Sequence, residues 1–109
     1  MDYIDPAVRT QVETTTERIC DELGVRHHGL RFRNAGHRLL IEVHLLFPSQ
    51  TGVGAAHRIA TKLEERLPGA LEMPAEVTTH LESLEDHSEV HRVQHAPGLK
   101  VRQNKVEER

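Results

Sequence analysis

Apolar residues recur with a helical period near the start of the chain. Asp5 and Pro6 have the residue types of an N-cap and a first helical residue. Gly24 suits the position just after a helix, because glycine readily adopts the left-handed conformation found there. Between them one stripe of small and apolar positions runs along Val8, Val12, Thr15, Ile19 and Leu23. The pattern predicts a helix over residues 6–23.

The pattern changes to strand-like segments over residues 26–47. Residues 26–33 and 37–47 are expected to form two strands, with a turn at Asn34, Ala35 and Gly36. Pro48 is expected to end the second strand, because proline cannot donate a hydrogen bond to a sheet. The two segments together predict a β-hairpin.

Helical periodicity returns over residues 52–67, and a last strand is expected at 76–82. The second helix keeps its apolar stripe at Val53, Ala56, Ala60, Leu63 and Leu67. Pro68 and Gly69 are expected to end this helix. The order is therefore helix, strand, strand, helix, strand.

This order predicts an α+β fold with two layers. A strand, a helix and a further strand normally form a crossover that leaves the two strands parallel and adjacent. The second strand then lies at the centre of a three-stranded mixed sheet, between its hairpin partner and the third strand.

The central strand has two faces, because successive side chains of a strand point to opposite sides. One set is expected to face the helices: Leu39, Ile41, Val43 and Leu45. The other set faces away from them: Leu40, Glu42, His44 and Leu46. Leucines on this second face predict that another subunit covers it, and we expect an oligomer.

A cluster of histidines is predicted on the same second face. His80 and Glu82 alternate with Thr79 and Leu81, so they project from one side of the last strand. His44 lies in the middle of the central strand, and His28 stands just ahead of Leu30 in the first. If the three strands are neighbours, His28, His44, His80 and Glu82 converge.

Imidazole and carboxylate without thiolate suit a borderline divalent cation. Zn²⁺ fits this donor set best, and Fe²⁺, Ni²⁺, Cu²⁺ and Mn²⁺ stay open, whereas a shell of oxygens alone would indicate Mg²⁺ or Ca²⁺. Four protein ligands would leave no open position for an activated water. We therefore do not expect an enzyme; a metal-dependent hydrolase would need such a position.

The chain of 109 residues supports one domain, which we place at residues 1–84. Residues 85–109 are polar and charged and are expected to form a flexible tail. His87, His91 and His95 recur there at every fourth residue. On a helix they would align as a chelating stripe, and otherwise they are solvated.

Charge and composition exclude other classes of function. The net charge is −3 and aromatic residues make up 3% of the chain, so we expect no nucleic-acid partner. No segment approaches the roughly 20 apolar residues that span a bilayer, and no signal peptide is visible. Cys20 cannot close an internal disulfide, which fits a reducing compartment, and it is expected to be a packed or partly exposed thiol and not a nucleophile.

Five segments together resemble one family. They are LRFRNAG at 30–36 with His28 ahead of it, IEVHL at 41–45, AHRIA at 56–60, LPG at 67–69 and VTTHLE at 77–82. In this order and at these intervals they resemble the cytoplasmic C-terminal domain of cation diffusion facilitator transporters. The resemblance covers about residues 1–83.

The resemblance implies a metallochaperone-like, ferredoxin-like αββαβ fold that forms a homodimer in the cytoplasm. It implies zinc or a similar divalent ion at the subunit interface, and a membrane domain upstream of residue 1 that the bound metal regulates. The ligands it implies are His28, His44, His80 and Glu82, with His57 as a helix histidine that can join a second metal. The sequence departs from the family in two ways: Glu82 stands where Asp is more familiar, and Gly54 and Ala55 replace acidic residues.

A second reading stays open beside this regulatory domain of an efflux transporter. A freestanding metal-binding or metallochaperone-like protein would have the same fold and the same ligands. The two readings differ in what lies upstream of Met1.

Overall fold

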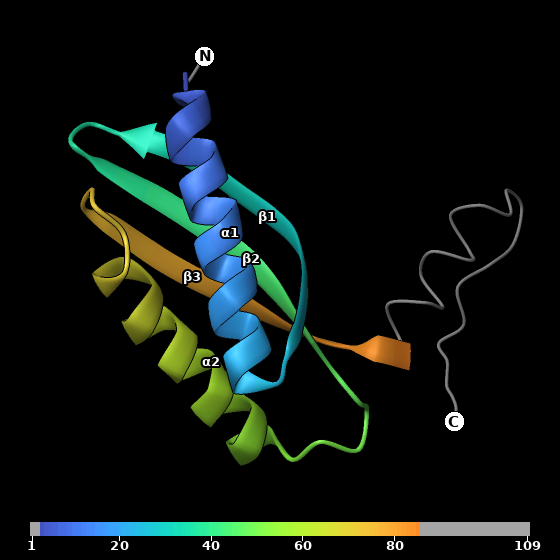
Figure 1. The fold of residues 1–109 in the computed structure, drawn as a ribbon. Coiled ribbons are helices and arrows are strands. Elements are labelled where there is room, and N and C mark those ends of the chain that lie inside the picture. The colour runs from blue at the N-terminus through green and yellow to red at the C-terminus, as the bar shows by residue number, and fades with distance from the viewer. Residues whose placement is uncertain (1–2, 86–109) are drawn as a thin grey trace, which may run out of the picture.

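The computed structural model describes residues 3–85, which contain two helices and three strands (Figure 1). The elements are α1 (Pro6–Leu23), β1 (Arg26–Ala35), β2 (Arg38–Phe47), α2 (Val53–Gly69) and β3 (Ala75–Ser83). The predicted α+β order is confirmed, and each bound lies within two residues of its expected position. The proposed tail at 85–109, with His87, His91 and His95, lies outside the described residues except for Glu85.

The first helix begins and ends as its residue types predict. The Asp5 carboxylate accepts a hydrogen bond from the Ala7 backbone N–H at 2.8 Å, and Pro6 occupies the first helical position. Gly24 has φ 73° and its N–H donates to the Asp21 carbonyl at 3.1 Å. These contacts satisfy backbone groups that a helix end would otherwise leave unpaired.

The second helix continues past its expected end. It includes Pro68 and stops at Gly69, two residues beyond the predicted last residue. Proline lacks an N–H, but its carbonyl still accepts. The Leu71 N–H donates to the Pro68 carbonyl at 3.3 Å, and the Ala70 N–H donates to Arg66 and Leu67 at 3.1 Å each. Those bonds close the last turn around the proline.

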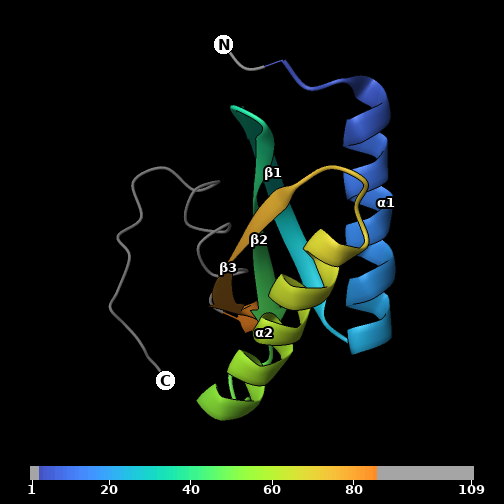
Figure 2. The same cartoon turned by 90° about the vertical axis from the view of Figure 1, so that its left-hand side faces the viewer.

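The sheet has the order β1-β2-β3, with β2 at its centre. β1 pairs with β2 as an antiparallel hairpin, and β3 pairs with β2 in parallel. Both helices cover the same face of this mixed sheet, as Figure 1 shows, and the turned view in Figure 2 places α1 to one side of the strands. The two-layer arrangement predicted from the element order is confirmed.

The core lies between that face and the two helices. Alternate residues of β2 are buried there, with Val43 and Leu45 fully inaccessible. The helices contribute Val12, Ile19, Cys20, Ala60, Leu63 and Leu67 to the same cluster. The opposite face, which we call the open face, carries Leu40, Glu42, His44 and Leu46 on its central strand. Leu40 is half-buried, and Leu46 is buried but lies outside the core cluster.

A bulge interrupts β1 at Gly29. His28 pairs with His44 and Arg31 pairs with Glu42, so Gly29 and Leu30 together oppose one residue of β2. Gly29 has φ 64°, a conformation that glycine adopts without strain. The extra residue lets His28 lie on the open face while Leu30 packs against the core. The uninterrupted strand expected at 26–33 would have placed both side chains on one face.

The structure also bears on membrane insertion. Among residues 3–85, neither helix is long and apolar enough to cross a bilayer.

Candidate metal centre

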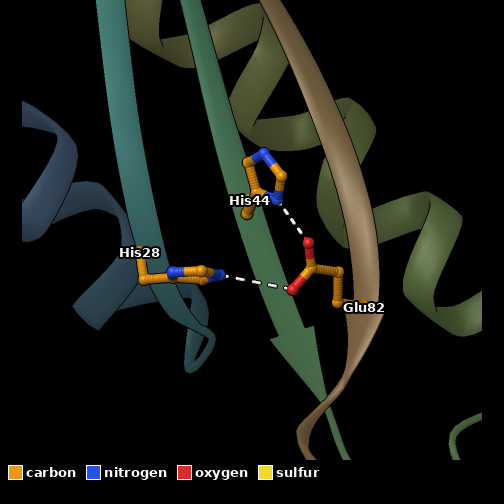
Figure 3. Close-up of side chains that lie close together, drawn as sticks. All are labelled: His28, His44 and Glu82. Atoms are coloured by element: carbon orange, nitrogen blue, oxygen red, sulfur yellow. Dashed lines mark hydrogen bonds and ion pairs between the residues drawn. The ribbon is translucent and has the colours of Figure 1, made fainter. Parts of the chain in front are cut away.

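Three side chains from three different strands meet on the open face: His28 of β1, His44 of β2 and Glu82 of β3 (Figure 3). His28 lies opposite His44 in the antiparallel pair. Glu82 pairs with Leu46 in the parallel register, so it lies on the same face one step along from His80. The convergence predicted for these three residues is what the strand registers produce.

Glu82 bridges the two imidazoles. His28 Nε2 donates to Glu82 Oε1 at 3.2 Å, and His44 Nδ1 contacts the other oxygen, Oε2. The hydrogen bond from His44 lowers the pKa of the Glu82 carboxyl; partial burial opposes this, and the bond from His28 adds to it. The carboxylate is therefore held ionised between two nitrogen donors.

The geometry of this group suits a small divalent cation. The ligand atoms of His28, His44 and Glu82 lie within 4.8 Å of one another. Around a tetrahedral zinc with bonds of about 2.0 Å, ligand atoms are roughly 3.3 Å apart, which is close to the distance between His28 and Glu82. The three side chains are 25–37% exposed, so a cation can reach them and is still partly shielded from water.

His80 joins a second group instead of the first. Its Nε2 lies 2.7 Å from Glu42 Oε2, and the same oxygen is 3.9 Å from His44 Nε2. The imidazoles of His44 and His80 stack with centroids 4.9 Å apart and planes 12° from parallel. The four expected ligands are thus divided between two groups that share His44, and Glu42 completes the second group.

Glu42 was not expected to be a ligand. It precedes His44 by two residues, so the period of a strand places both on the open face. The alternation of side chains along β2 was thus the sequence signal that could have identified Glu42 as a candidate ligand. What the sequence could not supply was the parallel register between β2 and β3, which brings His80 alongside His44 and within reach of Glu42.

The ring of His44 packs against the bulge. A methyl group added at Gly29 would lie 3.4 Å from Cδ2 of His44. The ring of His28 meets that of His44 edge to face, with centroids 5.3 Å apart. The backbone of Gly29 therefore lies directly beside the central imidazole.

His57 lies away from these groups. It is exposed on α2, and it belongs to neither group of candidate ligands among residues 3–85. Cys20 is 1% exposed, and burial, together with the charge of Asp21, raises the pKa of its thiol to about 11. Of the packed and the partly exposed thiol that the sequence left open, the structure shows the packed one.

An αββαβ sandwich with histidines and carboxylates on its open sheet face defines a metallochaperone-like domain. Residues 4–84 match the family model described as the cytoplasmic domain of cation efflux proteins. The chain belongs to this family, and the resemblance to cation diffusion facilitator domains is confirmed.

Relatives of known sequence or structure agree with this assignment. An uncharacterised transporter of Synechocystis sp. is 37% identical over 90 residues, which cover 79% of this chain and 27% of the relative. The zinc form of CzrB, a candidate zinc transporter, is 26% identical with a TM-score of 0.68, covering 79% of this chain and 96% of that one.

A more distant structure has the same fold. The metal-bound C-terminal domain of the CzcD transporter from Thermotoga maritima is 19% identical with a TM-score of 0.66, covering 74% of this chain and 95% of that one. Coverage is nearly complete for both isolated domains, whereas the chain spans only about a quarter of the length of the Synechocystis transporter.

Proposed function

We propose that the chain is a regulatory and dimerisation domain of a divalent-cation efflux transporter, and that it binds the cation, most suitably Zn²⁺, on its open sheet face. The observation that carries the proposal is the convergence of His28, His44 and Glu82 from three strands. Two imidazoles and one carboxylate are the donors that zinc prefers, and no thiolate lies among them. Binding would tie the three strands together at one point.

The proposed partner is a second copy of the chain. Both helices lie on the other side of the sheet, so within residues 3–85 no helix separates the open face from another subunit (Figure 1). Half-buried Leu40 lies on this face, four residues before His44 on β2. A cation at the interface would draw ligands or water from both sides, and homodimerisation would then depend on metal.

The membrane domain that such metal binding regulates is proposed to lie upstream of residue 1. The relative from Synechocystis is a transporter and is much longer than this chain. The absence of an enzymatic role stays a prediction, and the membership in a family of transporter domains supports it.

His80 and His57 remain proposed ligands with different support. His80 lies against His44 and contributes a ligand atom to the second group. His57 lies on α2, outside both groups, so it would need a cation that reaches the helix layer, for example one shared with a second subunit.

Calorimetric titration of the purified chain with Zn²⁺ tests the proposal. His44→Ala removes the shared imidazole and should weaken the tightest binding event by at least tenfold, since changes beyond the ligands themselves already cost about 10 to 100-fold. His37→Ala is the matched control, because His37 is exposed at the hairpin turn and belongs to neither group. Equal affinities for the two variants would overturn the proposal.

A further inference from the structure

We infer that Glu42, His44 and His80 form a second divalent-cation position, and that it competes with the first position for His44. The inference rests on the proposed function, because it concerns the same face and shares one ligand with the first position. It assigns to Glu42 a role as a metal ligand and gives the face two alternative places for one tightly held ion.

The second group has the same donors as the first: two imidazoles and one carboxylate. Its ligand atoms lie within 4.8 Å of one another, and Glu42 Oε2 is 2.7 Å from His80 Nε2. A hollow of about 500 Å³ opens beside Glu42 and His80, lined also by Arg31 and Thr78. A hydrated cation can therefore reach these ligands from solvent.

His44 offers a different nitrogen to each group. Its Nδ1 contacts Glu82, and its Nε2 lies 3.9 Å from Glu42 on the other side of the ring. A neutral imidazole has one nitrogen with a free lone pair and one that carries the proton. It therefore binds one cation at a time, and the two positions cannot both be filled through His44.

The proton of His44 is on a different nitrogen in each of these states. When Nδ1 binds an ion together with His28 and Glu82, the proton is on Nε2, which lies 3.9 Å from Glu42 and so forms no hydrogen bond with it. When Nε2 binds an ion together with Glu42 and His80, the proton is on Nδ1, and Glu82 accepts it. Such outer hydrogen bonds fix the tautomer and orientation of a ligating histidine. The hydrogen bond to Glu82 therefore orients the ring of His44 for the second position.

A double-mutant cycle with Zn²⁺ separates this arrangement from a single site. All proteins carry alanine at His87, His91 and His95, so that tail histidines do not bind the metal. Glu82→Gln should weaken the tightest event by only about tenfold, because the ion moves to the second position. Glu42→Gln should change it by less than about threefold, because the three ligands of the first position are unchanged and Glu42, at 3.9 Å, makes no hydrogen bond to His44. The two together should weaken it by far more than the product of the single effects.

Further variants control for folding and for charge. Glu76→Gln removes an open-face carboxylate that pairs with Arg38 and belongs to neither group, so in the Glu82→Gln background it should add nothing. His80→Ala in that background should reproduce the loss caused by Glu42→Gln. Nitrogen-15 spectra of the ring of His80 should respond to Zn²⁺ in the Glu82→Gln protein.

The outcomes distinguish this inference from the proposed function. If the double variant binds as the Glu82→Gln protein does, Glu42 is not a ligand and the second position is overturned, while the first stands. If two ions per chain bind with equal tightness at neutral pH, the competition for His44 is overturned. If His44→Ala leaves binding unchanged in every background, the proposed function itself fails.

Discussion

The backbone of Gly29 packs against the imidazole of His44, so closely that a single added methyl group would lie 3.4 Å from Cδ2 of the ring. The contact thus links the residue at the bulge of β1 to a candidate metal ligand on β2. The same glycine makes the bulge that turns His28 to the open face and Leu30 to the core. Its φ of 64° favours glycine at this position, and any side chain added there would touch the ring of His44.

Gly29→Ala should weaken zinc binding as well as stability. The left-handed conformation costs an L-residue about 1–2 kcal/mol, and relaxation of that strain would shift the backbone and the new methyl group against the adjoining ring of His44. Gly36→Ala is the control, since Gly36 has φ 73° but no atom within 4 Å of the added group. Urea denaturation should show a similar loss of stability for both, whereas zinc titration should show weaker binding for Gly29→Ala alone. Unchanged zinc affinity in Gly29→Ala would contradict the role of this contact.

Stability of the metal-free chain should fall in acid partly through Glu82. The pKa of this carboxyl is lowered in the folded state, first by the hydrogen bond from His44, so its contribution is present above the unfolded pKa of about 4.5. The contribution is lost as the pH falls through the lowered folded pKa. Denaturant titrations between pH 6 and 3 should therefore show a steeper loss for the native chain than for Glu82→Gln. Parallel curves of stability against pH for the two proteins would contradict the hydrogen bonds that Glu82 makes with the two imidazoles.

Zinc affinity should decrease between about pH 7 and pH 5.5. A ligating imidazole must give up its proton, and free histidine titrates near 6.5. The Glu82 carboxyl stays ionised over this window because its pKa is lowered. Calorimetry between these pH values should thus report competition between protons and Zn²⁺ for the histidine nitrogens. A flat affinity would indicate that carboxylates alone hold the ion.

Cys20 should be inert in the folded protein. Its side chain is 1% exposed, and its thiol has a pKa of about 11, so little reactive thiolate forms at pH 8. A thiol reagent such as DTNB should modify it far more slowly in the native chain than in urea. Zinc affinity of Cys20→Ser should equal that of the native chain, and a loss of affinity would assign this thiol to the metal site.

Thr16→Val should stabilise the fold. Thr16 is fully buried in α1, and none of the residues that the structure describes pairs with its hydroxyl oxygen. A buried unpaired hydroxyl costs about 1–3 kcal/mol, and valine keeps the β-branched shape. The exposed Thr14 donates to the Thr10 carbonyl at 2.9 Å and provides the comparison, since Thr14→Val should gain nothing. Thermal denaturation should show a higher midpoint for Thr16→Val only.

The sequence by itself determined the elements and the faces of the central strand. Helical and two-residue periods are properties of neighbouring residues, so the core side of Val43 and the open side of His44 follow from local order. The caps at Asp5 and Gly24 are local for the same reason. Even the end of α2, missed by two residues, was misplaced only because the carbonyl of Pro68 still accepts in a last turn.

Only the tertiary structure decided how the ligands are grouped. The local sequence at Gly29 does not reveal a bulge, because the bulge exists only relative to the partner strand, where two residues oppose one. The placement of His80 beside Glu42 depends likewise on the parallel register set by the crossover through α2. Register is a relation between segments far apart in the chain, and packing against the helices selects it. The two-residue alternation within β2 can therefore assign His44 to a face of the sheet. It cannot show which carboxylate lies near each nitrogen of the ring, because that depends on the register of the neighbouring strands.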